Sequence, residues 1–124
     1  MLLLPVAFSS AALAAEPAAQ FKRDLVPILR ARCAACHVTG KEPGKIALHP
    51  AAAYANLVNV ASVGARFPRV KPGKPDESYL TMKLDGTHLD RGGTGARMPF
   101  GQAPLDAATR GKFRAWIAAG ARND

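Results

Sequence analysis

The sequence predicts a single all-α domain. Apolar residues recur at helical spacing near both ends of the chain, and residues typical of helix caps bound these stretches. No stretch alternates apolar and polar residues for long enough to predict a strand. A chain of 124 residues has room for one domain, and 48% hydrophobic residues is typical of a folded protein. We therefore expect helices at both ends with long loops between them.

The first predicted helix covers residues 18–36. Phe21, Leu25 and Leu29 recur at the spacing of one helix face. Pro27 lies inside this stretch, so we expect it either to begin the regular part of the helix or to kink it.

Two shorter helices are predicted at residues 50–58 and 75–86. Pro50 suits the first turn of the earlier one. Pro75 opens the later one, acidic residues follow in its first turn, and Gly86 ends it.

A loop and a final helix complete the chain. Residues 87–104 are rich in Gly and Pro and show no periodicity, so this loop is either mobile or held against another part of the fold. The last helix covers residues 106–119, with Asp106 as its N-cap and Gly120 as its stop. One face of it carries Phe113, Trp116 and Ile117.

Residues 1–15 predict a secretory signal peptide, which leaves residues 16–124 as the mature domain. An apolar run at residues 2–8 precedes a small-x-small pattern, so we expect cleavage near Ala14 or Ala15. No Lys or Arg precedes the run, unlike the usual start of such a signal. The run is shorter than the ~20 residues that span a membrane, so no stable membrane insertion of the mature chain is expected.

The chain is basic, with a formal net charge of +8 from 17 Lys and Arg against 9 Asp and Glu. The basic residues are spread along the sequence rather than clustered, and nucleic acid is a poor partner for an exported protein. An acidic protein surface is the expected partner, and a purely solvated basic surface is the alternative.

Both cysteines of the chain lie in the pentapeptide CAACH, from Cys33 to His37. A redox dithiol of the thioredoxin type should follow a strand, and no strand is predicted. A zinc site needs four ligands, whereas His49 and His88 are single residues in unrelated segments. A c-type haem explains each residue of the motif, because cysteines at i and i+3 reach two vinyl groups and the next residue reaches the iron. We therefore predict covalent haem attachment at Cys33 and Cys36 with His37 as an axial ligand.

A haem iron bound by His37 has a second axial position. Met98 is the favoured ligand, because it precedes Pro99 in an aperiodic loop with no helix from which to pack. Met82 lies in a helical pattern and is predicted to be a core residue. His88, in the same loop as Met98, is the rival ligand and would give bis-His coordination.

Four segments together resemble the small class I, single-haem cytochromes c of bacteria. They are VPILRARCAACH at 26–37, VKPGKPDESYLTMKLDG at 70–86, RMPFGQAPL at 97–105 and FRAWIAAGA at 113–121. The resemblance implies a cytochrome c-like fold, in which the N- and C-terminal helices cross and short middle helices and long loops surround one haem. It implies thioether bonds to Cys33 and Cys36, His37 and Met98 as the iron ligands, and Trp116 in the core near the haem.

The sequence departs from that pattern at two places. Val38 and Thr39 follow His37 where a Gly is usual. Gly111 lies inside the last predicted helix, where Gly costs up to ~1 kcal/mol relative to Ala, so a close helix contact is expected there.

The resemblance implies a periplasmic electron carrier and not an enzyme, and the net charge predicts that its redox partners dock through acidic surfaces. The alternatives are a haem-bearing subunit of a larger oxidoreductase, and a haem enzyme or gas-binding protein with an open iron site. His49 and His88 are otherwise expected at the surface, as are nearly all Lys and Arg side chains. The candidates for the docking rim are Lys41, Lys45, Arg91 and Arg97, and those for binding the haem propionates are Arg66, Arg69, Lys71 and Arg97.

Overall fold

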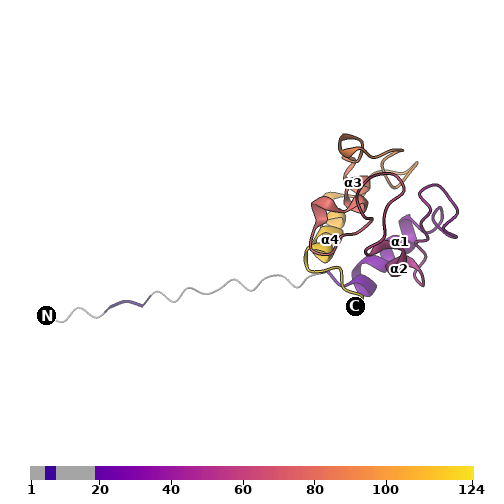
Figure 1. The fold of residues 1–124 in the computed structure, drawn as a ribbon. Coiled ribbons are helices and arrows are strands. Elements are labelled where there is room, and N and C mark those ends of the chain that lie inside the picture. Colours follow the sequence, from indigo (N-terminus) through magenta and orange to yellow (C-terminus); the bar gives the residue numbers. More distant parts are fainter. Residues whose placement is uncertain (1–4, 8–18) are drawn as a thin grey trace.

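Helices and loops, and no strand, make up the part of the chain that this computed structural model describes, residues 5–7 and 19–124 (Figure 1). The predicted signal peptide, residues 1–15, lies outside the described residues except for residues 5–7. The all-α prediction is confirmed for the described part. In chain order its helices are η1 (Phe21–Leu25), α1 (Val26–Arg32), α2 (Ala53–Leu57), η2 (Pro75–Glu77), α3 (Tyr79–Asp85), η3 (Leu89–Arg91) and α4 (Ala107–Ala118).

The N-terminal helix is shorter than predicted and changes type along its length. Its first turn, η1, is a π turn in which the Val26 N–H donates to the Phe21 carbonyl. Pro27 lies in the first turn of α1, so it begins the α-helical part. A proline suits this position because the first N–H groups of an α-helix have no partner within the helix. The helix ends before Cys33, whose φ of −128° departs from helical values.

The middle helices also differ from their predicted bounds. Helix α2 has only five residues, Ala53–Leu57. The helix predicted at 75–86 is divided into the 3-10 turn η2 and helix α3 by Ser78, whose ψ is 122°. The Ser78 hydroxyl donates to the Lys74 carbonyl and accepts from the Lys71 N–H, so contacts with the preceding loop hold this residue extended. Gly86 ends α3 in the left-handed conformation, as predicted.

Helix α4 matches its prediction most closely. The Asp106 carboxylate accepts a hydrogen bond of 2.7 Å from the Thr109 N–H, and this bond lowers the pKa of Asp106. Gly120 follows the helix with a φ of 113°. The close contact expected at Gly111 is wrong, because a Cβ at this exposed position would have no atom within 4 Å.

The core joins the two ends of the described chain. The rings of Phe21 and Trp116 lie 5.0 Å apart, and both side chains are almost fully buried. The Tyr54 hydroxyl donates to the Ala121 carbonyl at 2.8 Å. The Lys22 N–H donates to the main-chain oxygen of Asp124 at 3.1 Å, so residue 124 lies beside the start of the N-terminal helix (Figure 1).

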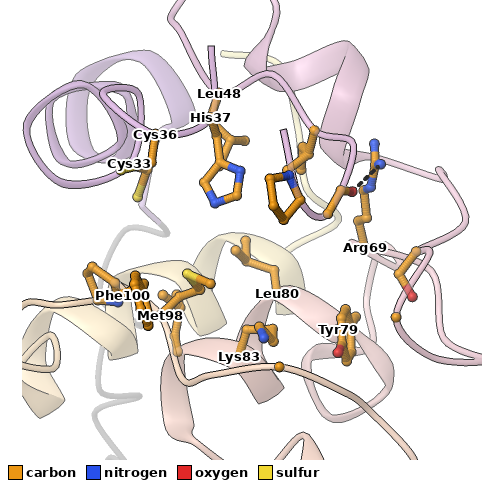
Figure 2. Close-up of a pocket in the computed structure, with 18 of the residues that line it drawn as sticks. Cys33, Cys36, His37, Leu48, Arg69, Tyr79, Leu80, Lys83, Met98 and Phe100 are labelled. Atoms are coloured by element: carbon orange, nitrogen blue, oxygen red, sulfur yellow. Dashed lines mark hydrogen bonds between the residues drawn. The ribbon is translucent and has the colours of Figure 1, made fainter. Parts of the chain in front are cut away.

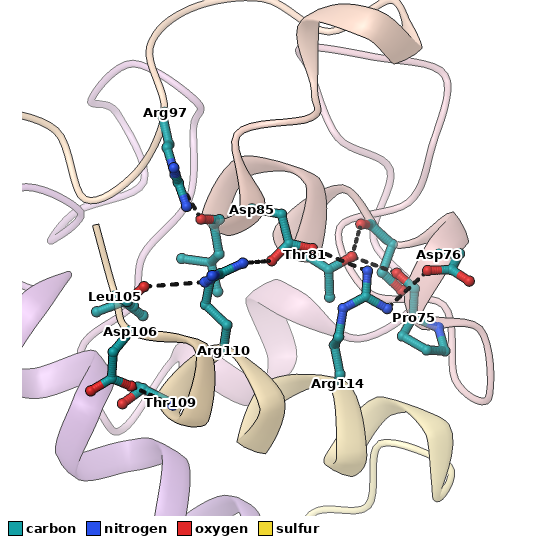
Figure 3. Close-up of polar contacts among 12 residues, drawn as sticks. Pro75, Asp76, Thr81, Asp85, Arg97, Leu105, Asp106, Thr109, Arg110 and Arg114 are labelled. Carbon is teal, nitrogen blue, oxygen red and sulfur yellow. Dashed lines mark hydrogen bonds and ion pairs between the residues drawn. The ribbon is translucent and has the colours of Figure 1, made fainter.

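Helix α3 is fixed to α4 by ion pairs (Figure 3). Asp85, at the end of α3, accepts from Arg110 and from Arg114, each at 3.0 Å. Arg114 also donates to Asp76 at 2.8 Å. Asp85 is largely buried, so these pairs are less screened than pairs at the surface. They set the position of α3, which forms one side of the cavity described below.

Two isolated bridges shape the chain between α2 and η2. Val58 pairs with Val70 in parallel and Ala61 pairs with Pro68 in antiparallel orientation. Among the described residues we find no helix with the length and the apolar character needed to cross a membrane.

Candidate functional site

A cavity of about 490 Å³ lies between the CAACH turn and helix α3 (Figure 2). We call residues 33–48 its proximal wall and residues 94–102 its distal wall. Helix α3 lines the cavity on the same side as the distal wall (Figure 2), and residues 62–64 also line the cavity. Its aliphatic lining comes from Ile46, Leu48, Leu57, Val63, Leu80 and Leu84.

The CAACH segment continues from α1 as a hydrogen-bonded turn. The N–H groups of Cys33 and Ala34 both donate to the Leu29 carbonyl, at 3.0 and 2.9 Å. The N–H groups of Cys36 and His37 then donate to the Cys33 carbonyl, at 3.2 and 3.1 Å. Because of this turn, both cysteines and the histidine line one cavity.

The two thiols are free and differ in their surroundings. Cys33 is half-buried and Cys36 is exposed. Burial raises the pKa of the Cys33 thiol to about 11, so this thiol is neutral at pH 7. Redox dithiols depend on a thiol whose pKa is lowered, so the environment of Cys33 does not favour that chemistry.

The His37 side chain points into the cavity from the proximal wall (Figure 2). Its Nδ1 atom is buried and has no hydrogen-bond partner among the described residues. Burial lowers the pKa of His37; Glu42 opposes this shift, and Lys83 and Arg69 add to it. The neutral imidazole that results is the form that binds metals.

The loop after His37 is closed by Glu42. The carboxylate of Glu42 accepts hydrogen bonds from the N–H and the hydroxyl of Thr39 and from the N–H of Gly40. These bonds lower the pKa of Glu42 to about 2, so the side chain remains ionised. Gly40 has a φ of 83°, which lets the chain turn one residue after Thr39.

Arg69 is a buried cation in the cavity wall. It is 8% exposed and donates to the carbonyl groups of Asn56, Gly44 and Lys45, at 2.9, 3.1 and 2.8 Å. Its pKa is lowered by burial, and no carboxylate of the described residues forms an ion pair with it. The expectation of a solvated side chain is therefore wrong for Arg69, because backbone carbonyl groups take the place of water.

Met98 enters the cavity from the distal wall, opposite His37 (Figure 2). Its N–H donates to the Lys83 carbonyl at 3.0 Å. The structure thus brings Cys33, Cys36, His37 and Met98 to one cavity.

The other candidate ligands lie elsewhere. His88 is buried, at 2% exposure, so its expected place at the surface is wrong; the loop closes over it and its Nε2 lies 2.7 Å from the Gly95 carbonyl oxygen. His88 is not among the residues that line the cavity, and neither are His49 and Met82. Met82 is 3% exposed, which confirms the prediction of a core methionine. Trp116 is also a core residue and does not line the cavity.

The structure selects among the basic candidates and adds a lysine that the sequence reasoning missed. Of the four propionate candidates, Arg69 alone lines the cavity. Arg97 instead donates to the Leu84 carbonyl, and Lys71 pairs with Glu77. Lys83 lines the cavity from α3, together with Tyr79 and Leu80. These residues are spaced to share one face of the predicted helix, and this spacing could have indicated that Lys83 faces the cavity.

Arg32 joins the two walls at the cysteine end of the cavity. Its guanidinium donates to the Gln102 side chain at 2.7 Å and to the Ala103 carbonyl at 2.8 Å. The residues that the structure describes contain no group of three or more His, Cys, Asp or Glu side chains that could hold a metal ion, so they offer no four-ligand zinc site.

Comparison of the chain with protein-family models, with curated protein sequences and with solved structures gives no match.

Proposed function

We propose that this chain is a periplasmic electron carrier with a cytochrome c-like fold and one covalently bound c-type haem. The observation that carries the proposal is the cavity itself, which two cysteines and a histidine line on one wall and a methionine lines on the other. The buried, unpartnered Nδ1 of His37 and the aliphatic lining fit a large apolar group with a metal at its centre.

Cys33 and Cys36 would hold the haem. Each thiol would add across one vinyl group, with a sulfur–carbon bond formed and the thiol hydrogen passing to the other vinyl carbon. This addition needs no external oxidant. The neutral state of Cys33 leaves its hydrogen in place until attachment.

His37 and Met98 would bind the iron from opposite walls. With His37 and Met98 both bound to the metal, these residues would keep small molecules away from it. Bound in this cavity, haem supplies one-electron chemistry, in which a reduced donor loses one electron and an oxidised acceptor gains it, with no atom transferred. A methionine opposite a histidine raises the reduction potential of such a site.

Arg69 would hold a carboxylate group of the haem. It is a buried cation at the cavity wall whose only partners in the described chain are backbone carbonyl groups. A carboxylate would offset the cost of burying this charge.

The partner that best suits the cavity mouth is an acidic redox protein. Glu42 is the only carboxylate that lines the described cavity, and its oxygens already accept from Thr39 and Gly40. Val63 and Phe100 line the cavity yet are 65% and 69% exposed, so they offer apolar contact area. Of the cations predicted for the docking rim, Lys41 and Lys45 belong to the proximal wall and are exposed.

The net positive charge should affect how fast the protein associates with an acidic donor, and this effect can be tested. The rate of reduction by an acidic donor should fall as ionic strength rises, because the attraction is screened within about a Debye length, ~10 Å at 0.1 M salt. Stopped-flow measurements across a salt series test this. A rate that stays flat or rises would show that the basic side chains are only solvated surface charges and do not attract the donor.

The decisive test of the function is expression with a haem-attachment system and export to the periplasm. Haem colour should stay with the polypeptide on a denaturing gel, and the reduced and oxidised absorption spectra should differ as they do for a six-coordinate haem. The matched control is the double variant Cys33→Ala, Cys36→Ala, which should carry no colour. Wild-type colour lost on denaturation would exclude covalent attachment, and tight carbon monoxide binding by the reduced wild type would favour the open-iron alternative.

A further inference from the structure

Lys83 holds the distal wall at two points. Its Nζ donates to the Thr94 carbonyl at 3.0 Å, and its own carbonyl accepts from the Met98 N–H at 3.0 Å. One residue of α3 is therefore bonded to both ends of the segment 94–98. In Figure 2 the side chains of Lys83 and Met98 lie on the same side of the cavity, across from His37.

The segment between these two points has a few other polar contacts. His88 Nε2 lies 2.7 Å from the Gly95 carbonyl oxygen, and the Tyr79 hydroxyl lies 3.3 Å from the Thr94 carbonyl oxygen. Gly95 and Ala96 have no long side chains, and both residues are exposed. Gly95 has a φ of 78°, and a Cβ there would lie 3.3 Å from the Lys83 Nζ, so the backbone passes close to the ammonium group. On the other side of Thr94, its N–H donates to the Tyr79 hydroxyl at 3.2 Å. Thr94 is thus bound to α3 through its N–H and its carbonyl.

The bond from Lys83 to Thr94 is of the stronger, charge-assisted kind. No carboxylate of the described residues forms an ion pair with Lys83, so no acidic side chain competes for its ammonium group. Lys83 is also half-buried, with its Nζ 6.0 Å from the centroid of the Tyr79 ring. These contacts favour one position of the side chain.

We propose that Lys83 is a positioning residue for Met98, and that its bond to Thr94 holds the thioether in place opposite His37. The inference rests on the proposed function, because its readout is iron ligation by Met98. Without this bond, the segment 94–98 would open more often and Met98 would leave the iron in a larger fraction of molecules. The expected increase is about tenfold, which corresponds to about 1.4 kcal/mol.

The test compares holoprotein variants that keep or lose the donor. Lys83→Met keeps the length and the apolar stem of the side chain but cannot donate, whereas Lys83→Arg keeps a charged donor. The matched control is Lys112→Met, which removes one exposed charge from α4 away from the cavity. The two readouts are the weak far-red sulfur-to-iron band of the ferric protein and the affinity of the reduced protein for carbon monoxide, which competes with Met98.

Lys83→Met should bind carbon monoxide about tenfold more tightly, whereas Lys83→Arg and Lys112→Met should resemble the wild type. The far-red band of Lys83→Met should weaken only by the additional fraction of molecules in which Met98 has left the iron. If Lys83→Met does not fold, Lys83→Leu takes its place, because its side chain is apolar and has no donor. An unchanged carbon monoxide affinity in the folded non-donor variant would overturn the inference, as would an equal gain of affinity in Lys83→Arg. A wild type without covalent haem colour would instead refute the proposed function.

Discussion

The proximal wall, residues 33–48, is held largely by hydrogen bonds within itself. The distal wall, residues 94–102, is held by bonds from helix α3 and also by single bonds from His88 and Arg32. In the proximal wall, the Cys33 carbonyl accepts from Cys36 and His37, and Glu42 closes the next turn. In the distal wall, the contacts of Thr94 and Met98 come from residues earlier in the sequence, on another element. The position of His37 is therefore a local property of the chain, and that of Met98 depends on where α3 lies.

This difference makes the distal wall the more sensitive of the two. Helix α3 is itself fixed by the ion pairs of Asp85 with Arg110 and Arg114. A change in the packing of α3 against α4 should therefore displace Met98 more than His37. The proximal wall has contacts from outside at two places. Arg69 donates to the carbonyl groups of Gly44 and Lys45, and the Ala47 N–H donates to the Asn56 side-chain oxygen at 3.1 Å.

The largest expected effect comes from removing the distal ligand. Met98→Ala should keep covalent haem colour, because the cysteines are untouched, but lose the far-red band completely. The reduced variant should bind carbon monoxide, since the position opposite His37 becomes open. Absorption spectra with and without carbon monoxide measure both changes.

His88→Ala is the matched variant for this prediction. Its imidazole lies outside the cavity and contacts the Gly95 carbonyl in segment 94–98, so the far-red band should weaken at most and should not be lost completely as in Met98→Ala. If His88→Ala opened the iron and Met98→Ala did not, the coordination would be bis-His and the assignment of the distal wall would be wrong.

A smaller effect on the haem site is expected when the contact of Arg69 with the proximal wall is broken. Arg69→Gln removes a buried charged donor from three backbone carbonyl groups, so the free energy of unfolding should fall by about 3 kcal/mol. The far-red band should remain, because the distal wall keeps its bonds to α3. Urea unfolding of the holoprotein measures the change.

Arg66→Gln is the control for Arg69, because it lies on the same segment but is exposed. It should change the free energy of unfolding by less than about 0.5 kcal/mol. Equal losses in the two variants would mean that Arg69 contributes through net charge and not through its bonds to Gly44 and Lys45.

The contrast between the walls also explains what the sequence could predict. The CAACH turn and helix α4 follow from local signals, the cysteine spacing in one case and Asp106 with Gly120 in the other. Ser78 divides a predicted helix because it bonds to Lys71 and Lys74 in the loop before it, which no local pattern reveals.

The sequence also did not allow us to predict which polar side chains are buried. Arg69 and His88 lie in segments with polar and turn-forming neighbours, and these patterns predict the surface. Both are buried because distant backbone carbonyl groups reach them: Gly44 and Lys45 in one case, Gly95 in the other. Lys83 was missed for the same reason, since its partner Thr94 lies in a loop without periodicity.

The smallest expected effect is a gain in stability that leaves both walls unchanged. Gly111 lies in α4, has open space where a Cβ would be, and does not have a positive φ. Gly111→Ala should therefore raise the free energy of unfolding by up to about 1 kcal/mol, because alanine favours the helix and restricts the unfolded chain. Carbon monoxide binding should not change, since local opening of the distal wall breaks the contact of Lys83 with Thr94 and leaves α4 folded.

Gly86→Ala, at the end of α3, should have the opposite effect on stability to Gly111→Ala. Gly86 has a φ of 77°, and a Cβ there would lie 2.9 Å from the Arg97 Cδ, next to Met98 in sequence. This variant should lose stability and also weaken the far-red band, because strain at this position falls on the distal wall. Urea unfolding and carbon monoxide titration of both variants separate the stability of the whole domain from that of the distal wall. A loss of stability in Gly111→Ala would show that α4 does make a close contact at this position, and equal carbon monoxide affinities in both variants would show that the distal wall does not depend on the end of α3.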